Sequence, residues 1–197
     1  MSTTPVYPVD VQLDAPLKVA RWRPIVHWLL AIPHLIVLYV LDFVQFVAWV
    51  IAWFAILFTG NMPESLFNLI TMVIRYQWRV TSYMAFMREP YPPFDFSLTA
   101  EDDGLDTPTR LSTQPPERLS RWRIFVKWLL AIPHLIILWF LGVASFVVLV
   151  IGFFAVIITG KWPEGLRRFY VGASRWSYRV TAYLYLLTDQ YPPFSLD

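Results

Sequence analysis

The sequence contains no cysteine, which excludes disulfide bonds, thiolate catalysis and cysteine-ligated metals. Charge is also scarce, because only 15% of the residues are charged and the formal net charge is +2. So small a net charge, without a basic cluster, argues against a nucleic-acid partner. The first 20 residues lack a basic region followed by a short apolar run, so we expect no cleavable signal.

Lysine and arginine are absent from two long stretches, between Arg23 and Arg75 and between Lys127 and Lys161. Apolar residues make up 57% of the chain, above the roughly 45–50% typical of soluble domains. They are concentrated in residues 25–58 and 128–158. Uncharged segments of this length predict membrane-embedded helices.

The chain repeats itself at an offset of 100 residues, and 23 of the 40 positions in 21–60 are identical in 121–160. A duplicated membrane unit is the predicted architecture. We divide the chain into an N-terminal extended segment (1–20), membrane repeat 1 (21–94), an acidic and proline-rich linker (95–120) and membrane repeat 2 (121–197). The linker carries Glu101, Asp102, Asp103 and Asp106, so it is expected outside the lipid.

The length of the apolar stretches predicts a turn in the middle of each. As one helix, residues 25–58 would extend about 51 Å, against a hydrocarbon core of about 30 Å. Asp42 and Gln45 lie midway, matched by Gly142 and Ser145. A hairpin turning there would keep Asp42 out of mid-membrane, where a carboxylate costs about 2.5–3.5 kcal/mol.

Downstream of each stretch, Pro63-Glu64 and Pro163-Glu164 are typical helix starts, and Thr59-Gly60 and Thr159-Gly160 are typical helix ends. The following segments have an amphipathic pattern. Their polar faces carry basic residues at i, i+4 spacing, which are candidates for binding anionic lipid headgroups or another anion: Arg75, Arg79, Arg175 and Arg179. We favour helices that lie in the interface, with helices crossing the bilayer as the alternative.

The predicted fold is therefore an all-α integral membrane protein, a tandem repeat in which each unit is a hydrophobic helical hairpin plus an amphipathic interfacial helix. Short extended segments lie beside the membrane. Candidate interfacial anchors occur at matching places in both repeats, namely Arg21, Trp22, Arg23, Trp28, Arg121, Trp122, Arg123 and Trp128. Since both Arg-Trp-Arg motifs are expected on the cytoplasmic side, we predict a multi-pass protein with both termini cytoplasmic.

Five motifs recur in the same order in both repeats: Arg-Trp-Arg, Trp-Leu-Leu-Ala-Ile-Pro-His, Thr-Gly-(x)2-Pro, Arg-(x)3-Arg-Val-Thr-(x)-Tyr and Tyr-Pro-Pro-Phe. This set resembles a bacterial, chiefly actinobacterial, membrane-protein family known only as a domain of unknown function. The resemblance covers nearly the whole chain as two copies. It implies a polytopic protein of the inner (plasma) membrane, and it implies no reaction.

The conserved spacing of His34 and His134 after Pro33 and Pro133 raises one cofactor hypothesis. Two histidines related by the repeat could ligate a haem iron from both sides. The favoured interpretation is structural: each imidazole bonds to backbone carbonyls freed by its proline or lies in a polar patch near the interface. No metal-ligand spacing, catalytic triad or phosphate loop is present, so no enzyme activity, metal or cofactor is expected.

The leading functional hypothesis is a non-catalytic inner-membrane scaffold or accessory subunit. Its expected partners are the lipid bilayer, anionic lipids and the helices of other membrane subunits, with no nucleic acid. The alternative is a small transporter or channel-like protein with its path between the two repeats. A haem-binding electron carrier that uses His34 and His134 is a third hypothesis.

Overall fold

The computed structural model describes residues 7–102, 104, 106 and 108–197. Residues 1–6 of the N-terminal extended segment and Asp103 of the linker lie outside the described residues. The helices are α1 (Arg23–Leu30), α2 (Ile32–Thr59), α3 (Glu64–Met84), α4 (Arg123–Thr159) and α5 (Glu164–Leu184), and the strands are β1 (Val9–Leu13) and β2 (Thr109–Thr113). The expected extended segment before repeat 1 contains β1, whereas β2 lies in the linker, for which no strand was predicted, and the two strands form one ribbon.

The predicted hairpins are wrong, because each apolar stretch continues as helix through its middle. α2 passes through Asp42 and Gln45, and α4 passes through Gly142 and Ser145. The polar groups of α2 face α3 without a turn, since Nε2 of Gln77 on α3 lies 2.8 Å from Oδ1 of the exposed Asp42 and 3.5 Å from Oε1 of the buried Gln45. A neighbouring helix therefore provides the partners that a turn would have provided.

The expected helix ends are confirmed. Gly60 and Gly160 follow the last residues of α2 and α4 with φ angles of 75° and 71°, in the left-handed region that glycine tolerates. The backbone N–H of each glycine donates to the carbonyl four residues earlier. The chain then turns back, so α3 packs against α2 and α5 packs against α4.

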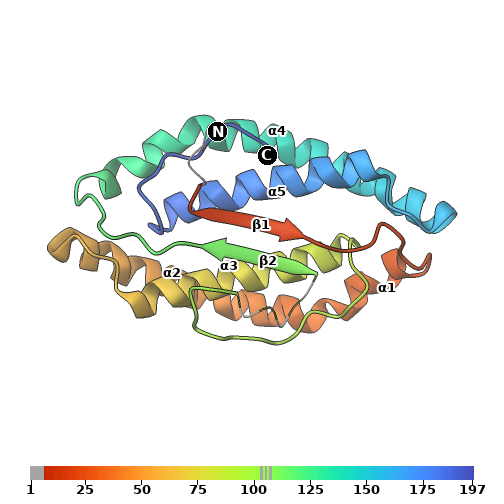
Figure 1. The fold of residues 1–197 in the computed structure, drawn as a ribbon, viewed down its shortest axis with the longest axis horizontal. Coiled ribbons are helices and arrows are strands. Elements are labelled where there is room, and N and C mark those ends of the chain that lie inside the picture. The colour runs from red at the N-terminus through yellow and green to blue at the C-terminus, as the bar shows by residue number, and fades with distance from the viewer. Residues whose placement is uncertain (1–6, 103, 105, 107) are drawn as a thin grey trace, which may run out of the picture.

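The elements form three layers (Figure 1). The two-stranded ribbon lies on one side, α3 and α5 lie behind it, and α2 and α4 lie on the other side of α3 and α5. β1 precedes repeat 1 but packs on α5 of repeat 2, whereas β2 precedes repeat 2 and packs on α3 of repeat 1. The repeats thus exchange their first strands.

A pseudo-twofold axis relates the two repeats. The antiparallel register pairs Val11 with Leu111, which are equivalent positions, and it pairs Val9 with Thr113 and Leu13 with Thr109, which are equivalent pairs. A twofold axis between antiparallel strands is perpendicular to the ribbon. The contacts outside the ribbon obey the same axis, because Leu119 N–H donates to Gly60 O and Val19 N–H donates to Gly160 O. α2 and α4 therefore run antiparallel.

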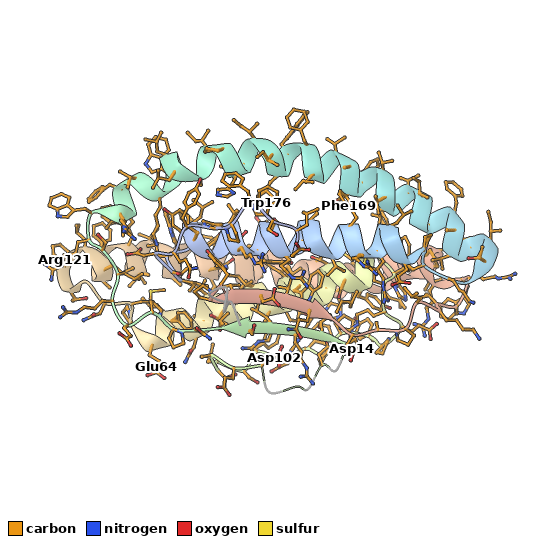
Figure 2. The ribbon with its side chains drawn as sticks, turned by 45° about the horizontal axis from the view of Figure 1, so that its top comes forward. Asp14, Glu64, Asp102, Arg121, Phe169 and Trp176 are labelled. Carbon is orange, nitrogen blue, oxygen red and sulfur yellow. The ribbon has the colours of Figure 1, made fainter. Side chains whose placement is uncertain are left out.

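The outer surfaces of α1, α2 and α4 are mainly apolar, with Asp42 of α2 and Arg123 at the start of α4 as exposed charged residues. Large side chains at successive turns are exposed, for example Ile36 at 64%, Phe43 at 68% and Phe58 at 72%. Both α2 and α4 are long and apolar enough to cross a membrane, yet only 22% and 17% of their most apolar windows are buried. A core helix of a soluble protein would be mostly covered. In Figure 2 the side chains of α4 project away from the ribbon.

Candidate functional site

The polar side chains of the amphipathic helices form an ion-pair layer between the helices and the ribbon side of the molecule. In repeat 1, the guanidinium of Arg79 lies 2.7 Å from Asp95 and 2.9 Å from Asp102. Arg88 pairs with Asp106, and the Arg88 side chain is fully buried. All three acids belong to the linker, so α3 holds the linker through charge-assisted hydrogen bonds.

Repeat 2 uses acids from the other end of the chain. Arg175 Nε lies 2.8 Å from Asp10 Oδ1, and Arg179 Nη2 lies 3.4 Å from the same atom. Arg179 also donates to the backbone carbonyl of Asp197 at 2.5 Å. Because Asp10 lies on β1, the strand exchange delivers a carboxylate to the arginines of α5.

These arginines do not form the outward basic surface that the sequence suggested. The exposed fractions of Arg75, Arg79 and Arg179 are 2%, 1% and 8%, and Arg175 is only partly exposed. The periodicity places each pair on one face of its own helix, but the linker covers that face of α3 and β1 covers that face of α5. Binding of lipid phosphate by these groups stays a prediction, and it would require displacement of their present partners.

Hydrogen bonds and one ion pair keep Asp95 charged. Burial opposes ionisation of this carboxyl, but hydrogen bonds from Ser97 and Arg79 outweigh burial and hold its pKa at about 2.

Asp102 and Arg175 also cover the two edges of the ribbon. Asp102 Oδ2 accepts from Leu111 N–H at 3.2 Å, and Arg175 Nε lies 3.3 Å from Val11 O. The ribbon therefore does not present free edges along these residues.

A second constellation surrounds each of the two repeat-related histidines. His34 Nδ1 lies 2.6 Å from the Tyr76 hydroxyl, and the imidazole stacks on Phe94 at a centroid distance of 4.3 Å. Tyr91 lies beside the ring at 4.6 Å and donates from its hydroxyl to Leu30 O at 3.2 Å. The proline–histidine motif and the Tyr-Pro-Pro-Phe motif thus meet in space and form an aromatic cage.

Repeat 2 has the equivalent cage. His134 stacks on Phe194 at 4.0 Å, and Tyr191 OH donates to Leu130 O at 3.1 Å. Trp176, which is labelled in Figure 2, replaces the tyrosine of the first cage and donates from Nε1 to His134 Nδ1 at 3.0 Å. Each histidine is fully buried among residues of its own repeat.

The partner of His134 defines its tautomer. An indole N–H only donates, so His134 Nδ1 accepts and the proton of a neutral ring lies on Nε2. A histidine that ligates iron through Nε2 needs the opposite arrangement, with a proton on Nδ1. The cage therefore does not suit His134 to haem ligation. Among the described residues, no group of three or more His, Asp or Glu side chains could hold a metal.

The candidate anchors lie where the two repeats meet. The indoles of Trp22, Trp28, Trp122 and Trp128 are exposed by 50% or more. Arg23 and Arg123 donate to the carbonyls of Glu89 and Asp189, at 3.1 and 3.3 Å. Arg21 and Arg121, the latter labelled in Figure 2, pack against Gly160 and Gly60 of the opposite repeat. Their position in a lipid interface stays a prediction.

The sequence did not indicate the partners of these residues. Asp10 and Asp95 had no predicted role and Asp102 was expected only as an acid of the linker, although the buried arginines of α3, α5 and the segment after α3 require counter-charges. Tyr76 and Trp176 were also missed, and their common position in the repeat was the available signal.

Comparison with known proteins identifies a family and no relative of known activity. No curated protein and no solved structure matches the chain. A family model matches twice, over residues 21–95 and 121–195, which together contain the whole of both repeats from the Arg-Trp-Arg motif to Tyr-Pro-Pro-Phe. The chain belongs to the family described as Domain of unknown function (DUF4389), of which it contains two tandem copies.

Proposed function

We propose that this protein is a non-catalytic membrane scaffold whose apolar layer, formed by α1, α2 and α4, lies in the plane of one leaflet. The ribbon and the linker then face water, where they are available to partner subunits. The observation that carries the proposal is the apolar outer face of α2 and α4, on the side of the molecule opposite the ribbon.

Helix length supports this orientation. At 1.5 Å per residue the 37 residues of α4 extend about 56 Å, nearly twice the hydrocarbon thickness of about 30 Å. The exposed apolar residues continue from Phe125 to Ile158, so no shorter segment is marked as the membrane span. A helix that lies in the leaflet has no such length limit.

The ribbon gives a second argument. It runs alongside α3 and α5 at the centre of the molecule, and Gln12, Arg110 and Ser112 on it are exposed. If α2 and α4 crossed the bilayer, the pseudo-twofold centre would lie at mid-membrane and Arg110 would face hydrocarbon. An arginine there costs at least about 2.5–3.5 kcal/mol.

The flanking arginines favour the same orientation. The pseudo-twofold axis places Arg21 and Arg23 at one end of the molecule and Arg121 and Arg123 at the other. A crossing orientation would therefore put equal arginine pairs on opposite membrane faces, against the positive-inside bias. An in-plane orientation places both pairs at one depth. It also keeps both ends of the chain on one side, as the sequence predicted.

Depth measurements test the proposal. Single cysteines replacing Ile36, Phe43 and Phe58 span about 33 Å along the helix. After nitroxide labelling in phospholipid vesicles, we expect similar oxygen and nickel-chelate accessibilities at all three, with a Ser112→Cys control accessible to the aqueous nickel chelate. A crossing helix, as the transporter hypothesis requires, would give a deep label at Phe43 and shallow labels at the ends. That profile, or aqueous accessibility at all three sites, would refute the in-plane scaffold.

A further inference from the structure

An apolar pocket of about 470 Å³ opens between the second half of α2 in repeat 1 and two parts of repeat 2, the start of α4 and the end of α5. Its walls come from α2, from the first turns of α4 and from the end of α5. The mouth carries the exposed rings of Phe46, Phe125 and Trp128, which belong to the outer apolar layer. The inner wall includes Ile124 and Leu186, which are 5% and 1% exposed. A volume of this size is typical of small-molecule sites.

We propose that this pocket holds one acyl chain of a phospholipid from the leaflet in which the protein lies. The proposal rests on the proposed function, because the mouth must be immersed in lipid. Water has few polar partners in a pocket lined mainly by Trp, Phe, Leu and Ile side chains, so hydrocarbon is the better occupant.

The ammonium of Lys127 and the indole N–H of Trp49 are already paired, which favours a chain over a headgroup. Lys127, the charged residue of the lining, directs its ammonium to Thr188 O at 2.6 Å and to Asp189 Oδ1 at 2.9 Å. Its aliphatic stem is what remains to contact a ligand. Trp49 Nε1 likewise donates to Leu184 O at 3.0 Å. The headgroup then stays at the leaflet surface, and its charge should matter little.

At the opposite junction between the repeats, aromatic side chains fill the site that is equivalent to the pocket. There Trp162 stacks on Phe86 with centroids 5.2 Å apart, and both side chains are at most 2% exposed. The equivalents at the pocket are Met62 and Leu186, which are smaller. Gly152 makes room for Trp162, since a Cβ there would lie 2.1 Å from the indole, whereas its equivalent in repeat 1 is Ala52.

Photolabelling distinguishes a chain inside the pocket from ordinary contact with surrounding lipid. The protein is reconstituted in vesicles of phosphatidylcholine that carries a diazirine in its acyl chain. Surrounding lipid can reach Trp139 and Phe140, which are 66% and 62% exposed. It cannot reach Ile124 or Leu186 unless a chain enters the pocket. We expect tandem mass spectrometry to locate label on Ile124 or Leu186 themselves, resolved from the exposed neighbours Phe125 and Trp128, as well as on Trp139 and Phe140. We also expect unchanged pocket labelling when an equal fraction of phosphatidylglycerol carries the probe.

Label at Trp139 and Phe140 but not at Ile124 or Leu186 would overturn the acyl-chain site, including the case in which a partner helix fills it. Absence of label at both would overturn the membrane scaffold itself. A variant that copies the filled junction, Ala52→Gly with Met62→Trp and Leu186→Phe, should lose at least tenfold of the Ile124 label and retain the label at Trp139. Unchanged Ile124 labelling in that variant would also refute the site.

Discussion

Removing the charge of Arg79 tests whether the ion-pair layer holds the protein together. The Arg79 side chain is 1% exposed, and its partners Asp95 and Asp102 are 8% and 6% exposed. Replacing Arg79 with Met keeps much of the side-chain volume but leaves two buried carboxylates without their main counter-charge. Breaking a buried pair in this way costs about 3–5 kcal/mol. We expect Arg79→Met to lower the free energy of unfolding by that amount.

The chain offers a matched surface control. Arg168 pairs with Glu164 at 2.8 Å, nearly the same distance, but the two side chains are 79% and 65% exposed. An exposed i, i+4 pair contributes about 0.3–0.5 kcal/mol. Arg168→Met should therefore change stability by less than about 1 kcal/mol. The difference between the two variants measures the effect of burial.

Equilibrium denaturation in a mild detergent, followed by tryptophan fluorescence, gives both free energies. A combined variant, Arg79→Met with Asp95→Asn and Asp102→Asn, separates charge from packing, because it removes the unpaired carboxylates. We expect it to recover part of the lost stability. Equal costs for Arg79→Met and Arg168→Met would refute the reasoning, and so would a combined variant less stable than Arg79→Met alone.

Two further predictions concern the linker and the junction near Trp162. The folded pKa of Asp95 is about 2 and its usual value is 3.8, so its ionised form stabilises the fold at neutral pH by roughly 2 kcal/mol. This contribution is lost as the pH falls from about 4 to about 2. When the free energy of unfolding is measured as a function of acid pH, Asp95→Asn should show a smaller decrease than the natural chain. Gly152→Ala should lower the free energy of unfolding by about 1–3 kcal/mol, because the added methyl would overlap Trp162. Gly142→Ala should be neutral or stabilising, because nothing lies within 4 Å of its added methyl. Thermal unfolding in detergent compares the two variants.

The sequence predicted the repeat, the helix ends and the amphipathic helices because each depends on local chemistry. The glycines at 60 and 160 and the periodic arginines of α3 and α5 are recognisable without tertiary contacts. The hairpins were mispredicted because local chemistry was insufficient. Asp42 was treated as a group that needs water, and the sequence does not reveal that Gln77 lies one helix away and donates to it.

In the candidate site, too, only the features that depend on local sequence spacing could be predicted. Sequence spacing placed Arg75 and Arg79 on one face, but it could not tell whether lipid phosphate or Asp95 would cover that face, since both are anionic. The histidines were singled out by their repeat-related positions, but their Nδ1 atoms contact the side chains of Tyr76 and Trp176 and not the freed backbone groups that were expected. Their cages could not be predicted, because Tyr91 and Phe94 lie about 60 residues further along the chain.

The exchange of strands accounts for the different acids that serve the two copies, although their apolar helices are similar in sequence. Each amphipathic helix needs carboxylates to neutralise its buried arginines. α5 takes Asp10 from β1, whereas α3 takes Asp95, Asp102 and Asp106 from the linker that leads into β2. A single repeat without the preceding strand of the other would leave the arginines of one helix without part of their counter-charge and expose one side of the ribbon. The two copies are therefore one cooperative structure, in which the acidic linker serves as an internal partner of α3 as well as a connection.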